Sequence, residues 1–146
     1  MTLLDQVQTD VTTALKAGDR ERAGALRLVV SELQKAHKEA TSDGADEVGV
    51  LQRERKRRLE SAEAYRGGGR DDLAANEERE AELISAYLPE QLSDEELHAI
   101  VGDAVAESGA SSPQEMGRVM SIVMPRVQGR ADGKRVSALV KETLAS

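Results

Sequence analysis

Apolar residues recur at helical spacing along almost the whole chain, and this spacing constrains the fold more than any other feature of the sequence. Near the start, for example, Leu4, Val7, Val11 and Leu15 follow one another at intervals of three or four residues, which places them on one face of a helix. β-Branched residues never alternate with polar ones over a useful length, as a half-buried strand would require. The sequence therefore predicts an all-α protein.

Glycine, proline and capping residues divide this pattern into separate helices. Gly18 and Gly109 follow apolar stripes, where glycine commonly ends a helix. Asp19 and Asp132 can cap the helices that follow them. Ser93 with Glu96 has the spacing of a capping box, and Pro113 suits a first helical position. The pattern predicts helices over residues 4–15, 19–40, 46–66, 71–88, 93–109, 113–129 and 132–144, with a bend or stop near Pro125. The third of these helices has a thin inward stripe that Arg55 interrupts, formed by Val48, Leu51, Leu59 and Ala62.

The segment YLPEQLS, residues 87–93, is the strongest candidate for a domain boundary. Leu88 precedes Pro89, and a proline disfavours helical backbone at the residue before it. We therefore predict an N-terminal helical bundle over residues 1–88 and a smaller C-terminal helical bundle over residues 89–146.

Composition excludes several classes of function. The chain has 146 residues, with 20 Lys and Arg against 27 Asp and Glu, an acidic balance that opposes general attraction to nucleic acid or anionic membranes. It has no cysteine for a disulfide or thiolate site. With neither a secretory leader nor an apolar run of about 20 residues, we expect a cytoplasmic protein without a membrane partner. The two tyrosines are the only aromatic residues, which disfavours base stacking and a bound cofactor.

Charge is distributed unevenly within the C-terminal part. Residues 93–115 contain six acidic side chains and no Lys or Arg, whereas residues 116–141 contain six basic side chains and one acid, Asp132. Clustered cations beside a glycine-containing turn and a helix N-terminus can bind phosphate. The alternative is a solvated face whose long side chains cover the apolar stripe. The candidate RNA-binding residues are Arg118, Arg126, Arg130, Lys134 and Arg135.

The remaining motifs favour structural roles. The basic run at 53–58 wraps around a helix and is better explained as a solvated surface. The methionines at 116, 120 and 124 share a face that suits core packing better than a groove for a partner. No Ser-His-acid or HExxH arrangement stands out, and the histidines at 37 and 98 are isolated. We therefore expect no metal site and assign no catalytic residue.

Three joined segments resemble the YqeY-like family: YLPEQLS at 87–93, EEL at 95–97, and the run from 108 to 140 that contains MGRVM and GRADGK. ALRLVVSEL at 25–33 and RERKRR at 53–58 are also similar to that family. The C-terminal half of the family resembles the tail of GatB, a subunit of the glutamine-dependent amidotransferase acting on Asp-tRNA(Asn) and Glu-tRNA(Gln). The resemblance thus implies a helical bundle followed by a GatB-tail-like bundle.

In the amidotransferase this tail helps to hold the tRNA body, while the chemistry occurs elsewhere. The resemblance therefore implies a tRNA-binding or amidotransferase-associated factor that is not catalytic by itself, although its family is associated with glutamine-dependent carbon–nitrogen ligases. The implied partners are tRNA or another structured RNA, amidotransferase subunits, or an aminoacyl-tRNA synthetase. The alternative is a helical protein-interaction adaptor without RNA binding.

Overall fold

The computed structural model describes residues 1–146 and is entirely helical, as the sequence predicted. Contacts between Cα atoms divide the chain into two compact units, Met1–Leu88 (unit 1) and Pro89–Ser146 (unit 2). Unit 1 contains α1 (Leu3–Lys16), α2 (Arg20–Glu39), α3 (Glu47–Gly67) and α4 (Asp71–Ser85). Unit 2 contains α5 (Asp94–Ser108), the 3₁₀ turn η1 (Pro113–Glu115), α6 (Met116–Val127) and α7 (Gly133–Ala145).

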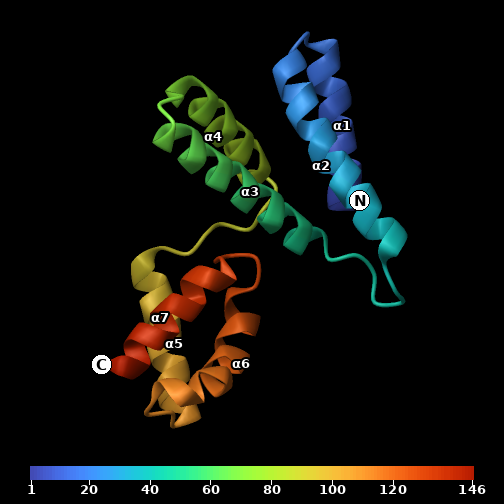
Figure 1. The fold of residues 1–146 in the computed structure, drawn as a ribbon. Helices are drawn as coiled ribbons and strands as arrows, with labels where there is room; N and C mark the ends of the chain where they lie inside the picture. Colours follow the sequence, from blue (N-terminus) through green and yellow to red (C-terminus); the bar gives the residue numbers. More distant parts are fainter. The chain divides into compact units, whose positions relative to one another are not determined.

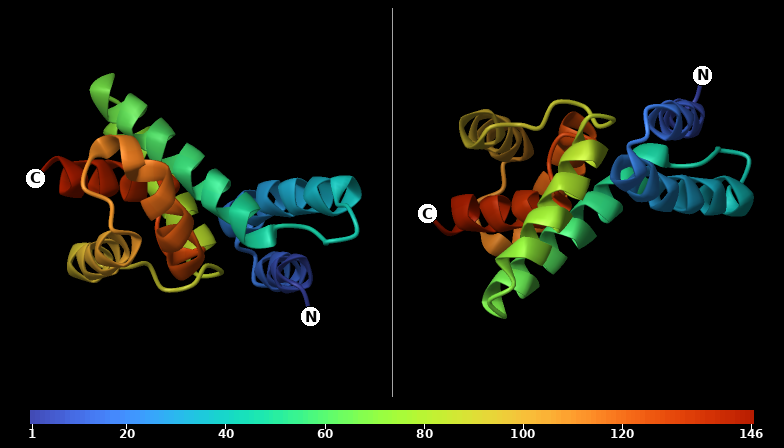
Figure 2. Two further views of the ribbon diagram at one scale, coloured as in Figure 1. Left: turned by 90° about the horizontal axis from the view of Figure 1, so that it is seen from below. Right: turned by 90° about the horizontal axis from the view of Figure 1, so that it is seen from above.

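Unit 1 is built from two helical hairpins. Helices α1 and α2 run side by side in opposite directions, and so do α3 and α4 (Figures 1 and 2). Gly18 makes the first turn with φ of 76°, a left-handed conformation that glycine adopts without strain. Buried residues from α1, α2, α3 and α4 form the shared core of this unit: Val7, Leu26, Val29, Leu33, Val50, Leu51 and Ile84.

The contact between α3 and α4 differs from the predicted apolar stripe. Leu59 was expected to face inward, but it is 38% exposed. Positions one, two and three turns after Leu51 on the same face are Arg55, Arg58 and Ala62, and Leu59 lies about 80° away from Leu51 around the helix. Two arginines therefore occupy the face that α4 covers, where the apolar pattern predicted a leucine.

Glu47, in the first turn of α3, connects three helices of unit 1. Its carboxylate accepts hydrogen bonds from the backbone N–H groups of Leu3 (3.3 Å) and Leu4 (2.9 Å) at the start of α1. The same carboxylate lies 3.0 Å from Nε2 of His37 near the end of α2. A negative side chain at a helix N-terminus satisfies free backbone donors and interacts favourably with the helix dipole. Glu47 thus fixes the start of α1 against α2 and α3.

Unit 2 packs α5, α6 and α7 around its own apolar core. Thirteen buried residues form this core, including Leu97, Val123 and Val136. Met116 and Met120 pack against it, as the core interpretation of the methionines predicted. That interpretation was wrong for Met124, which is 37% exposed. The chain before α5 also joins the unit, because the N–H of Leu92 donates to the carbonyl of Arg130 at 2.8 Å. This bond holds the entry to α5 beside the turn between α6 and α7.

Predicted caps account for several helix starts. Asp19 accepts a hydrogen bond from the N–H of Arg22, and Ser93 accepts one from Glu96. Asp132 accepts one from the N–H of Lys134 at the start of α7. Helix α6 continues two residues past Pro125 and ends at Val127. These short-range signals are local to the chain, so sequence alone could find them.

Candidate nucleic-acid interface

The five predicted RNA-binding residues all belong to α6, α7 or the turn between these helices. Arg118 and Arg126 are in α6, Arg130 is in the turn, and Lys134 and Arg135 are in the first turn of α7. All five side chains are exposed or half-buried. They differ in their partners, and the partners decide which cations are available to a phosphate.

Arg126 is held by a carboxylate of α5. Its Nη1 lies 2.6 Å from Oε2 of Glu107, and its Nη2 donates to Oε1 of the same carboxylate at 2.9 Å. This two-bond arrangement is the geometry that arginine also uses with phosphate. The hydrogen bond from Arg126 lowers the pKa of the Glu107 carboxyl despite a small opposing effect of burial. Both groups are therefore charged and paired at neutral pH.

Arg135 and Arg130 also meet acidic residues of α5. Arg135 donates to the carbonyl oxygen of Leu92 at 3.0 Å and forms an ion pair with Asp94. Arg130 lies 3.8 Å from Glu96, which is close to the limit for an ion pair. Three of the five predicted cations are thus paired with carboxylates from the acidic helix.

Lys134 and Arg118 have no carboxylate partner. Arg118 donates to the backbone carbonyl of Ser108 at 3.2 Å, and Lys134 forms no ion pair. Lys141, seven residues after Lys134, is also exposed and unpaired and lies on the same face of α7. This pair of lysines, separated by about 10 Å along the helix axis, is the cationic surface of α7 that remains open.

The N-terminus of α7 is not an open anion site. The sequence places it beside the candidate cations, and a helix start favours anions through its free N–H groups. In the structure, however, the Asp132 carboxylate already accepts the hydrogen bond of Lys134 N–H at 3.0 Å. A phosphate would have to displace a negatively charged cap, so the side chains of α7 are better contacts than its N-terminus.

The pairing of acidic residues of α5 with the candidate RNA-binding residues was not predicted from the sequence. Asp94, Glu96 and Glu107 were predicted only as part of an acidic helix, and their pairing with the following helices was not anticipated. A usable signal was present, because the six acids of residues 93–115 match the six basic residues of 116–141 in number. Equal and opposite charge on successive helices of one bundle favours pairing between them.

The basic run at 53–58 makes more contacts within the fold than the sequence predicted. Arg55 donates from Nε to the Ser85 hydroxyl at 2.8 Å, so it bonds α3 to α4. Arg58 pairs with Glu80 of α4 at 3.3 Å and with the buried Glu54 of its own helix at 3.2 Å. Only part of the run is solvated, contrary to the sequence interpretation, since a helix face occupied by arginine was not recognised as a packing face.

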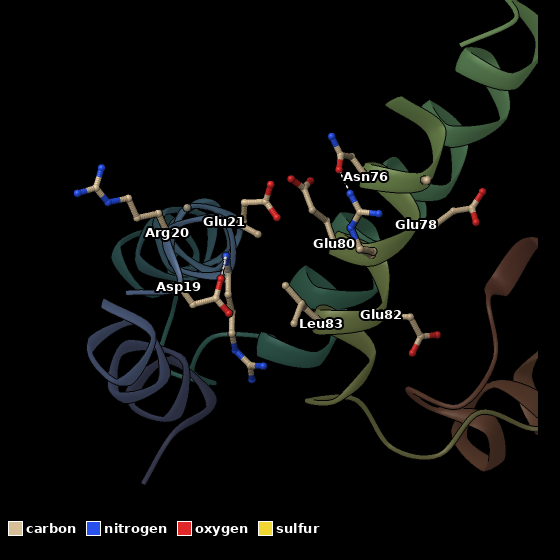
Figure 3. Close-up of a pocket in the computed structure, with 13 residues that line it drawn as sticks. Asp19, Arg20, Glu21, Asn76, Glu78, Glu80, Glu82 and Leu83 are labelled. Atoms are coloured by element: carbon tan, nitrogen blue, oxygen red, sulfur yellow. Dashed lines mark hydrogen bonds between the residues drawn. The ribbon is translucent and has the colours of Figure 1, made fainter. Parts of the chain in front are cut away.

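Unit 1 contains an open groove between α2 and α4, with a volume of about 750 Å³. Its walls carry both signs of charge, with Glu21 and Arg22 on α2 and Arg79 and Glu80 on α4. Figure 3 shows Glu80 and Leu83 extending from α4 toward α2, whereas Arg20 points away from the groove. This mixture of charges does not select one class of ligand, so the groove adds no site to the interface in unit 2.

Two further observations concern other kinds of site. No three histidine or acidic side chains come close enough together to hold a metal ion. None of the helices combines the length and the apolar character that crossing a membrane would need. Two glutamates of α4 pair with arginines of α3: Glu78 with Arg66, and Glu80 with Arg58.

The fold and the charge pattern together define a helical protein of two units with a small cationic surface on the second. Residues 4–144 match the family described as Yqey-like protein, and the chain belongs to this family. A curated relative is Altered inheritance of mitochondria protein 41, mitochondrial, from Pyrenophora tritici-repentis (strain Pt-1C-BFP). It is 25% identical over 149 residues, which span 99% of this chain and 82% of the relative.

Proposed function

We propose that this YqeY-like protein binds tRNA or a similar folded RNA through unit 2, as a non-catalytic factor associated with tRNA amidation. The observation that carries the proposal is the exposed face of α7, on which Lys134 and Lys141 have no carboxylate partner. Arg118 adds a third cation whose hydrogen-bond partner is a backbone carbonyl. The GatB-like tail that the sequence resemblance implies for the C-terminal part suggests the class of RNA.

Physical chemistry limits the strength of this binding. Unit 2 contains more acidic than basic residues overall, so long-range attraction is weak and only the local cations favour a polyanion. Contacts to phosphates without base recognition typically give dissociation constants of about 1–100 μM at physiological salt. The near absence of aromatic side chains is compatible with recognition of backbone and shape in folded RNA. We therefore expect weak, strongly salt-dependent binding.

The test is a charge reversal on the exposed face of α7. Lys134→Glu/Lys141→Glu should weaken binding of the full chain to labelled bulk tRNA by about tenfold or more at low salt. The slope of log affinity against log salt should fall by the amount expected for the loss of roughly one phosphate contact per lysine. Binding is measured by fluorescence anisotropy at several salt concentrations. Circular dichroism verifies that the variant keeps its helical content.

The matched control changes the same charge elsewhere in the chain. Lys35→Glu/Lys38→Glu reverses two exposed lysines of α2 in unit 1, and it should retain most of the affinity. Equal losses in both variants would show that only net charge matters and would refute an interface on α7. Failure of the wild-type chain to bind tRNA at low salt would refute the RNA proposal itself.

A second candidate function is a helical protein-interaction adaptor, which the pairing of Arg126, Arg130 and Arg135 with α5 favours. Paired arginines are less available to phosphate. Affinity purification followed by nuclease treatment separates the candidates. A stoichiometric protein that remains bound after nuclease supports the adaptor, whereas release of nucleic acid supports the RNA-binding factor.

The amidotransferase association and the cytoplasmic location belong to the same proposal. Amidotransferase subunits or an aminoacyl-tRNA synthetase would be the expected protein partners, and crosslinking in cells followed by identification of the bound proteins tests for them. Amide transfer by the pure chain alone would contradict the non-catalytic role. Subcellular fractionation tests the location, since the fungal relative carries the word mitochondrial in its name.

A further inference from the structure

The acidic helix α5 lies beside the cations that the proposed function would use, and its carboxylates hold three of them. Arg126 is bound by both oxygens of Glu107, at 2.6 and 2.9 Å. Arg135 is paired with Asp94, and Arg130 lies 3.8 Å from Glu96. An RNA phosphate that approaches any of these arginines meets a carboxylate already in the position that the phosphate would occupy.

These ion pairs are exposed enough to exchange. The side chains of Arg126 and Glu107 are 41% and 52% exposed, and Asp94 is 87% exposed. Exposed ion pairs are weak because water screens the charges and two mobile side chains must be ordered. The carboxylates therefore compete with phosphate without excluding it permanently.

We infer that α5 is an internal competitor for RNA, in which Asp94 and Glu107 mask Arg135 and Arg126 from the phosphate backbone. This inference rests on the proposed RNA-binding function and describes regulation of the same surface. It divides the candidate residues into two groups. Lys134 and Lys141 make the first contacts, and the masked arginines add contacts only after their carboxylates have moved away.

Masking of arginines by α5 affects the salt dependence of RNA binding in a way that a change in net charge alone does not. Binding to phosphates becomes salt-dependent because bound counterions are released from the RNA, with a slope of about 0.7–0.9 for each contact between a cation and a phosphate. An arginine that remains on its carboxylate contributes no such contact. Freeing two arginines should therefore steepen the dependence of log affinity on log salt by about 1.5, in addition to raising the affinity.

The experiment compares two variants that remove the same charge from unit 2 of the full chain. Asp94→Asn/Glu107→Gln removes the partners of Arg135 and Arg126. The control, Glu95→Gln/Glu142→Gln, removes two exposed carboxylates that form no ion pair. We expect the first variant to bind labelled bulk tRNA about fivefold more tightly at low salt, with the steeper slope, and the control to change affinity by less than about twofold with an unchanged slope.

A double-mutant cycle assigns the gain to the freed arginine. Arg126→Ala should have little effect in the wild-type background, but it should abolish most of the gain produced by Glu107→Gln. Circular dichroism and thermal unfolding identify any variant that fails to fold, and the single substitution Glu107→Gln, near the C-terminal end of α5, provides a second variant that leaves the first turn of this helix unchanged.

The outcomes separate this inference from the proposed function. If all variants bind tRNA with the same slope as the wild type, α5 does not mask the arginines and the inference is wrong, while RNA binding stands. Equal gains in the masked and control variants would likewise overturn it. If neither the wild type nor the freed variant binds at low salt, the proposed function fails. A steeper slope confined to the freed variant supports both.

Discussion

Replacing Glu47 with glutamine tests how the helices of unit 1 are held together. The carboxylate accepts two backbone hydrogen bonds at the start of α1 and contacts His37, with 16% of its side chain exposed. Hydrogen bonds to a charged group contribute about 1.5–3 kcal/mol each in favourable cases. Glutamine retains one acceptor oxygen without the charge, so we expect Glu47→Gln to lower the free energy of unfolding by about 2 kcal/mol.

The pH dependence of this effect has a defined sign. Burial raises the pKa of Glu47, but hydrogen bonds from His37 and from the N–H groups of Leu4 and Leu3 outweigh it, and the pKa lies below its ordinary value. A carboxyl with a lowered pKa in the folded state stabilises the fold above its ordinary pKa, and this stabilisation is lost as pH falls through the lowered pKa. The difference between wild type and variant should therefore be full at neutral pH and shrink in acid.

The assay is urea unfolding of the full chain, followed by circular dichroism at neutral pH and at a pH below the ordinary glutamate pKa. Glu60→Gln is the matched control, since Glu60 is an exposed residue of the same helix with no ion pair. It should change the free energy of unfolding by less than about 0.5 kcal/mol. A loss below that value for Glu47→Gln, or a loss that is the same at both pH values, would refute the role assigned to this carboxylate.

Three further predictions concern other contacts of the fold. Arg58→Ala should destabilise unit 1 by about 1–3 kcal/mol, because it removes an interhelical partner and leaves the buried Glu54 with one exposed arginine. Urea unfolding measures this loss. Tyr87→Phe should lower the free energy of unfolding by about 1 kcal/mol, because it removes the hydrogen bond from the Tyr87 hydroxyl to Asp10. Burial, and to a lesser extent this hydrogen bond, raises the pKa of Tyr87 above its ordinary value, and ultraviolet titration detects this shift. Residues 89–146, expressed alone, should be helical and unfold cooperatively, because this unit has its own core.

Each of these predictions has a contradicting result. Arg53→Ala, a substitution of an exposed arginine without an ion pair, is the control for Arg58→Ala, and equal losses would show that the contact to α4 contributes nothing. Ionisation of Tyr87 at the ordinary tyrosine pKa would contradict its bond to Asp10. An isolated 89–146 segment without cooperative unfolding would refute the prediction that the second domain folds independently.

The sequence was sufficient to predict those features of the fold that depend on residues close together in the chain. Ser93, Asp19 and Asp132 were recognised as caps because a cap satisfies N–H groups two or three residues away. Apolar spacing also identified part of the core, including Val7. These features depend on residues close together in the chain, so no knowledge of the tertiary arrangement was required.

Sequence was insufficient where the partner lies on another helix. Periodicity shows that residues share a face, but it does not show which helix covers that face. Arg55 was treated as an interruption of an apolar stripe, although it bonds to Ser85 of α4 across the interface. The cluster of cations after Met116 was expected to be open, although α5 neutralises Arg126 and Arg135. The likeness of unit 2 to the GatB tail stays a prediction.

The most direct test of RNA binding by unit 2 is an amide-resolved NMR titration of the full chain with bulk tRNA. If unit 2 binds RNA through this surface, perturbations concentrate around Arg118 and over residues 130–141, and those of α2, which also carries exposed lysines, stay small. Raising the salt concentration should reverse the perturbations. Perturbations confined to α2 or to the groove between α2 and α4, or none at all at low salt, would contradict RNA binding through this surface.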